Sequence, residues 1–308
     1  MRLVRGLHRV PEEARRRVVT IGNFDGVHLG HREICRVVSE RAKEYAADSL
    51  ALTFYPHPLA VLAPEKAPEL LLRFSDRLRL LFEAGIEVVV AQRFTREFSR
   101  IPAEEFVRRH LVEKLGAVHV VVGHNVRFGR DRRGDGNLLR ECGAKLGFSV
   151  DVVGPVRVGE TVVSSTTIRK AVLDGDMDRA RALLGRPYFV RGRVVHGTGR
   201  GRTLGYPTAN LFTTWRLLPP NGVYAVLVTA EGVACRGIAN LGVRPTFGGV
   251  ERSLEAHLFD FRGDLYGKRL RVAFVRRLRE ERRFESPEAL RRQIDRDAEL
   301  ARRVLDEL

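Results

Sequence analysis

Two histidines that follow an apolar run are the residues of this chain best suited to phosphate chemistry. Residues 18–21 predict a short buried strand, and His28 and His31 come soon after it with Gly30 between them. A helix that begins here presents unpaired backbone N–H groups and the positive end of its dipole, and both attract phosphate. Two imidazoles at this point therefore predict a site that binds a triphosphate. The alternative is an ordinary strand-to-helix turn with two surface histidines.

The turn between that strand and the histidines is rich in glycine. Gly22 and Gly26 allow a tight turn, and Gly30 lets a nucleotide lie close to the backbone because it has no side chain. The residues of this turn that we expect to bind the nucleotide are Gly22, Asn23, Phe24, Asp25 and Gly30.

A hydroxyl-rich segment later in the same half predicts a second phosphate contact. Residues 163–170 place four hydroxyl groups at a predicted helix start, where they can cap the helix or bind phosphate oxygens. A plain helix cap is the alternative. Together with the histidines, the hydroxyl-rich segment predicts a clamp for nucleotidyl transfer. This reaction depends on charge stabilisation and alignment more than on a covalent nucleophile. The residues assigned to this side are Ser164, Ser165, Thr166 and Arg169.

Two more segments of the first half predict a pocket for a flat heterocyclic acceptor. Each follows a predicted strand and combines polar groups with aromatic or proline surface. Ordinary loop packing is the alternative. The residues are Tyr55, Pro56, His57 and Pro58 in the first segment, and Asn125 and Phe128 in the second.

The second half carries a glycine-rich loop over residues 197–205, whose backbone N–H groups can surround phosphates. Thr208 and Asn210 follow it at a spacing of two, which places both on one face of an extended strand. A hydroxyl and a carboxamide oxygen are hard ligands suited to Mg²⁺. A turn residue at a strand end is the alternative for Asn210. The loop residues assigned to the nucleotide are Gly197, Gly199, Gly201 and Arg202.

A carboxylate on a later predicted strand is a candidate general base. Alternation over residues 254–260 places Glu255, His257 and Phe259 on one face. If Glu255 faces the glycine-rich loop, it can take the proton from an alcohol that attacks a γ-phosphate, a role worth roughly 10²–10⁴ in rate. An exposed edge residue is the alternative.

Alternating apolar runs and helical patterns position the first set of groups. The alternation predicts a doubly wound, Rossmann-like parallel sheet with helices on both faces. Ligands bind such sheets beyond the carboxyl ends of the strands, where residues 22–31 would lie. The predicted strands are 18–21, 50–55, 86–91, 118–122 and 148–153. The predicted helices are 30–46, 75–84, 102–115 and 137–146, followed by two short ones within 165–184.

The pattern changes near residue 185. Short apolar segments separated by Gly, Pro and Asn predict a small β-barrel, and Ser286 before Pro287 predicts the start of a final amphipathic helix. We therefore expect two domains, residues 1–185 and 186–308. The predicted barrel strands are 188–195, 223–229, 233–240, 254–260 and 269–275.

Composition agrees with two globular domains. The 308 residues are 44% hydrophobic and 30% charged. No apolar run is long enough to cross a bilayer, and the N-terminus lacks the apolar stretch of a secretory signal. Cys35, Cys142 and Cys235 are scattered, which argues against disulfides or a zinc site and predicts a reducing compartment. We expect a cytoplasmic protein with no membrane partner.

The net charge of +16 raises the alternative of a nucleic-acid-binding protein on a nucleotidyltransferase-like scaffold. Arginines supply most of this charge and are spread through both halves, with acidic residues among them. No basic tail or aromatic stacking platform accompanies them. Anionic small substrates are a sufficient reason for positive clefts, and so we expect no nucleic-acid partner. The sequence predicts no particular oligomeric state.

The ordered set of motifs resembles the prokaryotic bifunctional riboflavin kinase/FMN adenylyltransferases, or FAD synthetases, over nearly the whole chain. Each short motif is moderately specific, and their order in one chain is much more so. The segments that carry the resemblance are 22–31, 55–58, 123–129, 164–169, 201–210, 240–249, 255–258 and 264–268.

The resemblance implies two reactions with ATP as co-substrate and Mg²⁺ as cofactor. The second domain would convert riboflavin and ATP to FMN and ADP, with Glu255 as base and Thr208 and Asn210 around Mg²⁺. The first domain would convert FMN and ATP to FAD and pyrophosphate, with His28 and His31 on the ATP phosphates. The flavin contacts it implies are Tyr55, Pro56, His57, Pro58, Asn125 and Phe128 in the first domain and Arg244, Pro245, Thr246 and Phe247 in the second.

The chain departs from the family pattern at a few positions. Asn125 and Val126 stand where Asp and Phe are common, Arg77 replaces a common lysine, and Tyr206 replaces the more usual phenylalanine. None of these is a proposed catalytic group. Two narrower alternatives are an enzyme with one active domain and an adenylyltransferase for another acceptor, such as nicotinamide mononucleotide.

Overall fold

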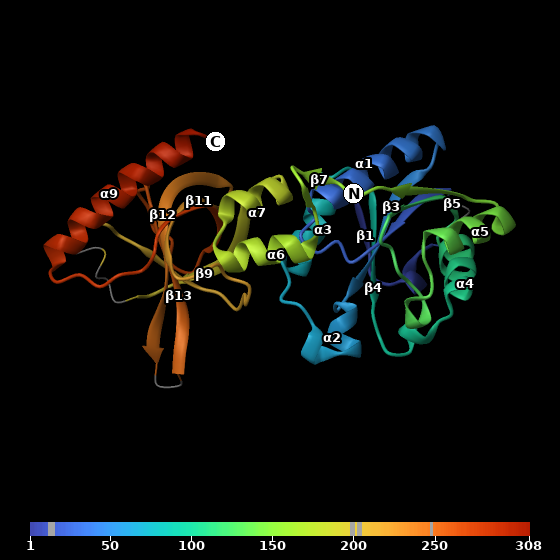
Figure 1. Ribbon diagram of the computed structural model, residues 1–308, viewed down its shortest axis with the longest axis horizontal. Coiled ribbons are helices and arrows are strands. Elements are labelled where there is room, and N and C mark those ends of the chain that lie inside the picture. The colour runs from blue at the N-terminus through green and yellow to red at the C-terminus, as the bar shows by residue number, and fades with distance from the viewer. Residues whose placement is uncertain (12–15, 198–200, 202–204, 247–248) are drawn as a thin grey trace. The chain divides into compact units, whose positions relative to one another are not determined.

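The chain forms two compact units, Met1–Ser165 and Thr166–Leu308 (Figure 1). The computed structural model describes residues 1–11, 16–197, 201, 205–246 and 249–308, and the side chains of residues 244–246 and 249–251 lie outside the description. The boundary expected near residue 185 is one between two functional domains rather than between compact units, and it stays a prediction.

A six-stranded parallel sheet forms the centre of the first unit. Its strands are hydrogen-bonded in the order β1-β4-β3-β2-β5-β6. The chain runs to one side of β2 through β3 and β4 and then returns to the other side as β5, so a topological switch point lies between β2 and β5. The strands are β1 (Arg2–Val4), β2 (Arg17–Ile21), β3 (Asp48–Tyr55), β4 (Val88–Arg93), β5 (Ala117–Gly123) and β6 (Ser149–Val153).

Helices cover both faces of this sheet, as the alternating pattern predicted. Phe106, Leu111 and Leu139 share one hydrophobic core with Val19 of β2, while α1 packs on β2, β3 and β5. The helices are α1 (Leu29–Glu44), α2 (Pro58–Leu62), α3 (Phe74–Glu83), α4 (Ala103–Phe106) and α5 (Gly136–Leu146). The smaller elements are the 3-10 turns Leu7–Arg9, Pro64–Lys66, Phe98–Arg100 and Arg130–Arg132 and the hairpin of β7 (Arg157–Val158) and β8 (Thr161–Val162).

The first unit contains several elements that the sequence did not predict, among them the short helix α2 and the β7–β8 hairpin. The helix expected over 102–115 is α-helical only through α4 and continues as a π-helix over Val107–Lys114. The short edge strand β1 was not predicted, because three residues carry too little periodicity to identify a strand.

The second unit is built on a closed six-stranded antiparallel barrel, in the order β10-β13-β12-β11-β14-β9. The barrel predicted from the short apolar segments is confirmed, although β10 was not among the predicted strands. The strands are β9 (Tyr188–Val195), β10 (Ala209–Phe212), β11 (Gly222–Ala230), β12 (Val233–Thr246), β13 (Gly249–Leu258) and β14 (Arg269–Arg279).

Three helices complete the second unit: α6 (Ser165–Asp174), α7 (Met177–Leu184) and α9 (Pro287–Asp306). The side chain of Ser286 caps α9 by accepting from the N–H of Ala289. Val304 and Leu305 of α9 pack against Ile238 of the barrel. An ion pair between the buried Asp297 and the half-buried Arg279, with a distance of 2.7 Å, fixes the helix further.

Candidate functional site

The paired histidines lie at the amino end of α1, beyond the carboxyl end of β2. His28 is the N-cap residue, and its Nδ1 accepts from the backbone N–H of His31 at 3.3 Å. An imidazole nitrogen that accepts a hydrogen bond carries no proton, so the neutral His28 ring bears its proton on Nε2. This tautomer makes Nε2–H a hydrogen-bond donor.

The two rings are stacked, with centroids 3.6 Å apart and an interplanar angle of 18°. Burial lowers the pKa of His31 well below the ordinary value of 6.5, and the nearby His28 and Arg77 lower it further. His31 is therefore neutral at neutral pH. Its Nδ1 is buried and finds no hydrogen-bond partner among the residues that the structure describes. His31 can therefore bind phosphate as a neutral hydrogen-bond donor.

The backbone of the turn before α1 is strained. Phe24 has φ of 49° and Val27 has φ of 39°, a region that side chains rarely adopt and that is least favourable for a β-branched residue. The Asp25 carboxylate stabilises the turn by accepting from the N–H groups of Leu71 and Leu72, at 2.9 Å and 3.3 Å. Asp25, predicted as a nucleotide contact, is thus only 5% exposed and directs its carboxylate at protein backbone.

The hydroxyl-rich segment reaches this turn through Ser165. Its Oγ donates to the backbone oxygen of Asp25 at 2.8 Å. Ser164 and Ser165 belong to the first unit, whereas Thr166 and Arg169 lie on α6 in the second unit. Their joint action on phosphate stays a prediction.

Arg77 is a buried residue of α3 that contacts the turn; sequence reasoning noted it but gave it no role. It is 2% exposed; one guanidinium nitrogen donates to the carbonyl of Asn23, and another to that of Phe54 at 3.3 Å. Burial lowers its pKa to about 10, while the charge of Asp25 raises it, and so the group remains a cation at neutral pH. Arg77 thereby joins the phosphate turn to the end of β3.

The segment after β3, predicted as part of the acceptor pocket, lies beside the turn. His57 caps α2, and its Nε2 lies 3.4 Å from Nδ2 of Asn23. The peptide bond between Tyr55 and Pro56 is cis. The Tyr55 side chain is 56% exposed, so most of its surface is open to a ligand.

The two residues predicted after β5 have different surroundings. Asn125 is exposed, whereas Phe128 is only 8% exposed and packs on Phe106 with ring centroids 5.5 Å apart. Phe128 is therefore a core residue of the first unit. A flavin contact at either residue stays a prediction.

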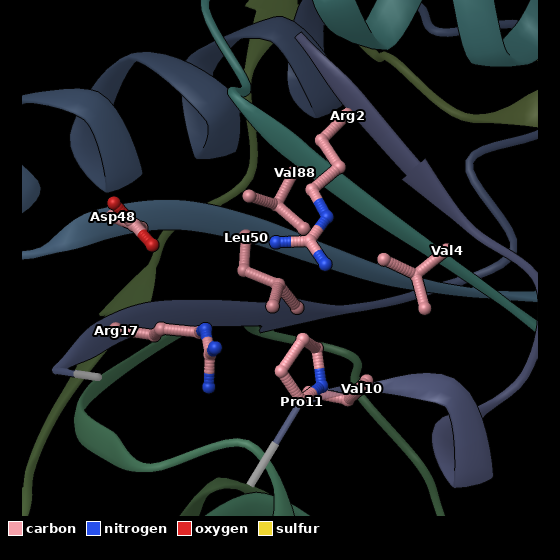
Figure 2. A pocket seen from close by; sticks show the side chains of 8 residues that line it. All are labelled: Arg2, Val4, Val10, Pro11, Arg17, Asp48, Leu50 and Val88. Atoms are coloured by element: carbon pink, nitrogen blue, oxygen red, sulfur yellow. The ribbon is translucent and has the colours of Figure 1, made fainter. Parts of the chain in front are cut away.

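A narrow cavity lies at the opposite end of the sheet, where the strands begin (Figure 2). It has room for about one water. Its lining residues are Arg2, Val4, Val10, Pro11, Arg17, Asp48, Leu50 and Val88. Since none of them belongs to the predicted site, this cavity is separate from the phosphate turn.

In the second unit, the register of the barrel aligns three polar residues. Asn210 on β10 is paired with Glu255 on β13, and Glu255 is paired with Asn240 on β12. The next row, Leu211 paired with Leu254, is buried in the barrel, so the polar row lies on its outer face. Asn240 was not assigned a role from sequence, because only the register places it beside Glu255.

Two of the described glycines of the glycine-rich loop, Gly197 and Gly201, lie against the predicted metal ligands or the residues beside them. A Cβ on Gly197 would lie 2.2 Å from Nδ2 of Asn210. A Cβ on Gly201 would lie 2.4 Å from the carbonyl oxygen of Tyr206 and 3.1 Å from Oγ1 of Thr208. A larger residue at either position would displace these groups. Gly199 and Arg202 lie outside the described residues.

This outer face suits a magnesium ion held mainly by a nucleotide. Among the described residues, no cluster of three or more His, Cys, Asp or Glu side chains could hold a metal. Mg²⁺ usually takes only one or two protein ligands and keeps water and phosphate oxygens. Thr208 just before β10 and Asn210 within it offer a hydroxyl and a carboxamide oxygen, and these two residues fit that role.

The remaining predicted flavin contacts fall at the end of β12. Arg244, Pro245 and Thr246 are in that strand, but their side chains are outside the description, as is Phe247 altogether. Their roles stay predictions.

The two folds and their sites define a two-part nucleotide-handling enzyme, and comparison with known proteins identifies its class. A family model described as FAD synthetase matches residues 10–167, and one described as riboflavin kinase matches residues 184–305. The chain belongs to the bifunctional riboflavin kinase/FMN adenylyltransferase family. It therefore phosphorylates riboflavin to FMN and adenylylates FMN to FAD, as the resemblance implied.

Relatives of this family match along the full chain. The bifunctional riboflavin kinase/FMN adenylyltransferase of Pseudomonas fluorescens is 44% identical, covering 98% of this chain and 97% of the relative. That of Escherichia coli K12 is 40% identical with the same coverage. A crystal structure described as a macrolide-efflux protein from Streptococcus pneumoniae superposes with a TM-score of 0.89 at 33% identity, covering 97% of this chain and 98% of that one. No helix within the described residues is long and apolar enough to span a membrane.

Proposed function

We propose that the two reactions are divided between the two sites, with FMN adenylylated at the paired histidines and riboflavin phosphorylated on the barrel. The observation that carries this proposal is the segregation of the groups. His28 and His31 belong to the first compact unit, while Thr208, Asn210 and Glu255 belong to the second.

In adenylyl transfer, a phosphate oxygen of FMN attacks the α-phosphorus of ATP, the bond to the β-phosphate breaks, and pyrophosphate leaves. The attacking oxygen is already ionised, so no general base is needed. His28 donates Nε2–H and His31 a ring N–H to the phosphates, where the amino end of α1 adds backbone donors and its dipole. We assign the turn residues Gly22, Asn23, Phe24, Asp25 and Gly30 to shaping this site, with Ser164, Ser165, Thr166 and Arg169 as further phosphate contacts.

In the kinase reaction, a riboflavin hydroxyl attacks the γ-phosphorus of ATP, and ADP leaves. A hydroxyl must lose its proton, and Glu255 accepts it from a position directly beside Asn210. Magnesium, held by Thr208 and Asn210, would neutralise charge on the ATP phosphates. The phosphate loop contributes Gly197, Gly199, Gly201 and Arg202.

The flavin contacts complete the proposal. Tyr55, with its exposed ring, leads the first set, and Arg244 begins the second. An aromatic ring beside a proline offers the flat surface that an isoalloxazine needs. The full sets are Tyr55, Pro56, His57, Pro58, Asn125 and Phe128 for FMN, and Arg244, Pro245, Thr246 and Phe247 for riboflavin.

We further infer that the enzyme acts in the cytoplasm and has no nucleic-acid partner. Cys35 and Cys142 are free and buried thiols, in keeping with a reducing compartment. Part of the positive charge is used within the fold, as in the bonds of Arg36 to Glu33 and Glu40. Fractionation should place the protein with cytosolic markers, and gel-shift assays with bulk RNA at physiological salt should show no complex.

Two substitutions test the division of labour. In a chromatographic time course of riboflavin with MgATP, His28→Ala should accumulate FMN and form FAD at least about 100-fold more slowly. Glu255→Gln should lose FMN formation by a similar factor and still convert added FMN to FAD. Each variant is the control for the other. If either one abolished both reactions in a folded protein, the division would be wrong.

A further inference from the structure

The segment that leads into β10 has an anchor outside the sheet. The β10–β13 ladder begins with Ala209 paired to Ala256, so Pro207 and Thr208 precede the first paired residue. Sheet hydrogen bonds therefore do not set the position of Thr208. Another contact must do so if its hydroxyl is to serve a metal-nucleotide complex.

His257 of β13 makes that contact. Its Nδ1 lies 2.9 Å from the backbone oxygen of Pro207. A carbonyl oxygen can only accept, so Nδ1 carries the proton and donates. Proline has no N–H, which makes this oxygen the one backbone group through which Pro207 can be held by a hydrogen bond.

The ring of His257 also contacts the neighbouring residue. It meets the ring of Tyr206 edge to face, with centroids 5.1 Å apart, and it lies 5.9 Å from the ring of Phe259. The backbone N–H of Tyr206 in turn donates to the carbonyl of Gly201 at 2.8 Å. One imidazole thus fixes the two residues between the glycine-rich loop and Thr208.

The strand places this imidazole beside the candidate base. His257 follows Glu255 by two positions, so both side chains project from the same face of β13. The strand that carries the base therefore also carries the group that sets the start of β10. Sequence analysis placed His257 on this face but gave it no role, because its partner lies 50 positions away in the chain.

We propose that His257 is a positioning residue of the riboflavin kinase reaction: by donating to the carbonyl of Pro207, it fixes Thr208 relative to Glu255. It touches neither substrate nor metal. The proposal rests on the assignment of Thr208 and Asn210 to the metal-nucleotide complex.

Two variants of the full-length enzyme separate the hydrogen bond from the bulk of the ring. His257→Leu keeps an apolar side chain of similar reach but removes the donor, and it should raise the KM for MgATP in riboflavin phosphorylation about tenfold. His257→Asn keeps an N–H donor near the position of Nδ1 and should stay within about threefold of the parent. The KM for riboflavin should change little in either variant. FAD formation from added FMN should be unchanged, and it serves as the control within the same chain.

Three outcomes would overturn the proposal. The first is a His257→Leu variant with the parent KM for MgATP. The second is His257→Asn impaired as much as His257→Leu, which would assign the effect to ring packing. The third is a rise in the KM for riboflavin with no change in the KM for MgATP. Thr208→Val is assayed alongside: if it leaves the kinase unimpaired, the metal assignment itself is wrong, whereas an impaired Thr208→Val beside an intact His257→Leu rejects only His257.

Discussion

The phosphate turn of the first unit and the polar row of the second unit hold their functional groups by different means. In the first unit Asp25, His28 and Arg77 are 5%, 6% and 2% exposed, and buried hydrogen bonds to backbone fix the turn. In the second unit Glu255 lies on the outer face of a barrel, where strand register aligns it with Asn210. Burial can tune protonation as well as position, which register alone does not do.

This difference determines what a substitution should disturb. A buried polar group that loses its partner is costly, so changes in the phosphate turn should affect both folding and FAD formation. In the outer polar row Glu255 is half-buried, and its replacement removes a group that water can replace, so this change should affect the chemistry and leave stability nearly unchanged.

Among the substitutions that test this contrast between the two sites, Arg77→Met is expected to have the largest effect on stability. Removing the guanidinium leaves the carbonyls of Asn23 and Phe54 buried without this donor, which should lower the free energy of unfolding of the first unit by about 3 kcal/mol. FAD formation should fall with it, while FMN formation continues. Denaturant unfolding together with hydrogen exchange over β2 and β3 measures the change.

Arg77→Lys is the matched control, since it keeps a cation and a hydrogen-bond donor at this position. It should retain most of the stability and most of the FAD-forming activity. Parent-like stability and activity in Arg77→Met would show that the buried guanidinium does not organise the turn.

A smaller effect is expected from pH. The pKa of His31 is lowered by burial, so the unfolded chain binds its proton more readily than the folded one does. The first unit should therefore lose stability as pH falls below about 6.5, and its stability should level off above that value. His31→Gln should flatten this dependence in denaturant titrations from pH 5 to 8. Burial also lowers the pKa values of His110 and His119, so part of the slope should remain. An unchanged slope in His31→Gln would contradict the prediction.

The smallest effect is expected for Tyr206→Phe in the second unit. The Tyr206 hydroxyl donates to Asp295 of α9, which is exposed, and burial and this bond raise the tyrosine pKa to about 12. Losing an exposed hydrogen bond should cost less than about 1 kcal/mol and raise the KM for MgATP at most about twofold. Steady-state kinetics of riboflavin phosphorylation measure this. A tenfold change would mean that this side of the barrel is held as tightly as the phosphate turn.

Patterns that act over short stretches of sequence predicted much of this molecule. The alternation of strands and helices indicated the sheet, and the position of His28 after an apolar run indicated its place at a helix start. Arg77 and His257 could not be interpreted in this way, because their partners at Asn23 and Pro207 are distant in the chain. Only the assembled fold shows that Arg77 is buried rather than an ordinary surface arginine of a helix.

Phe128 is a residue whose pattern indicated a ligand contact but whose packing in the fold could not be predicted. Its aromatic ring in a loop after a strand is typical of a ligand contact, and the sequence gives no sign that it packs on Phe106. Whether a loop aromatic turns inward depends on the volume left between β5 and α4, which no local pattern encodes.

The capping bond of His28 links the charge of its ring to the integrity of a helix. Nδ1 accepts from the N–H of His31 and so caps the first turn of α1, which the backbone bond from the N–H of Arg32 to the carbonyl of His28 closes. A proton cannot occupy that nitrogen while it accepts, and the imidazolium form therefore exists only when α1 gives up its cap. Protonation of Nδ1 and loss of this side-chain cap are thus a single event.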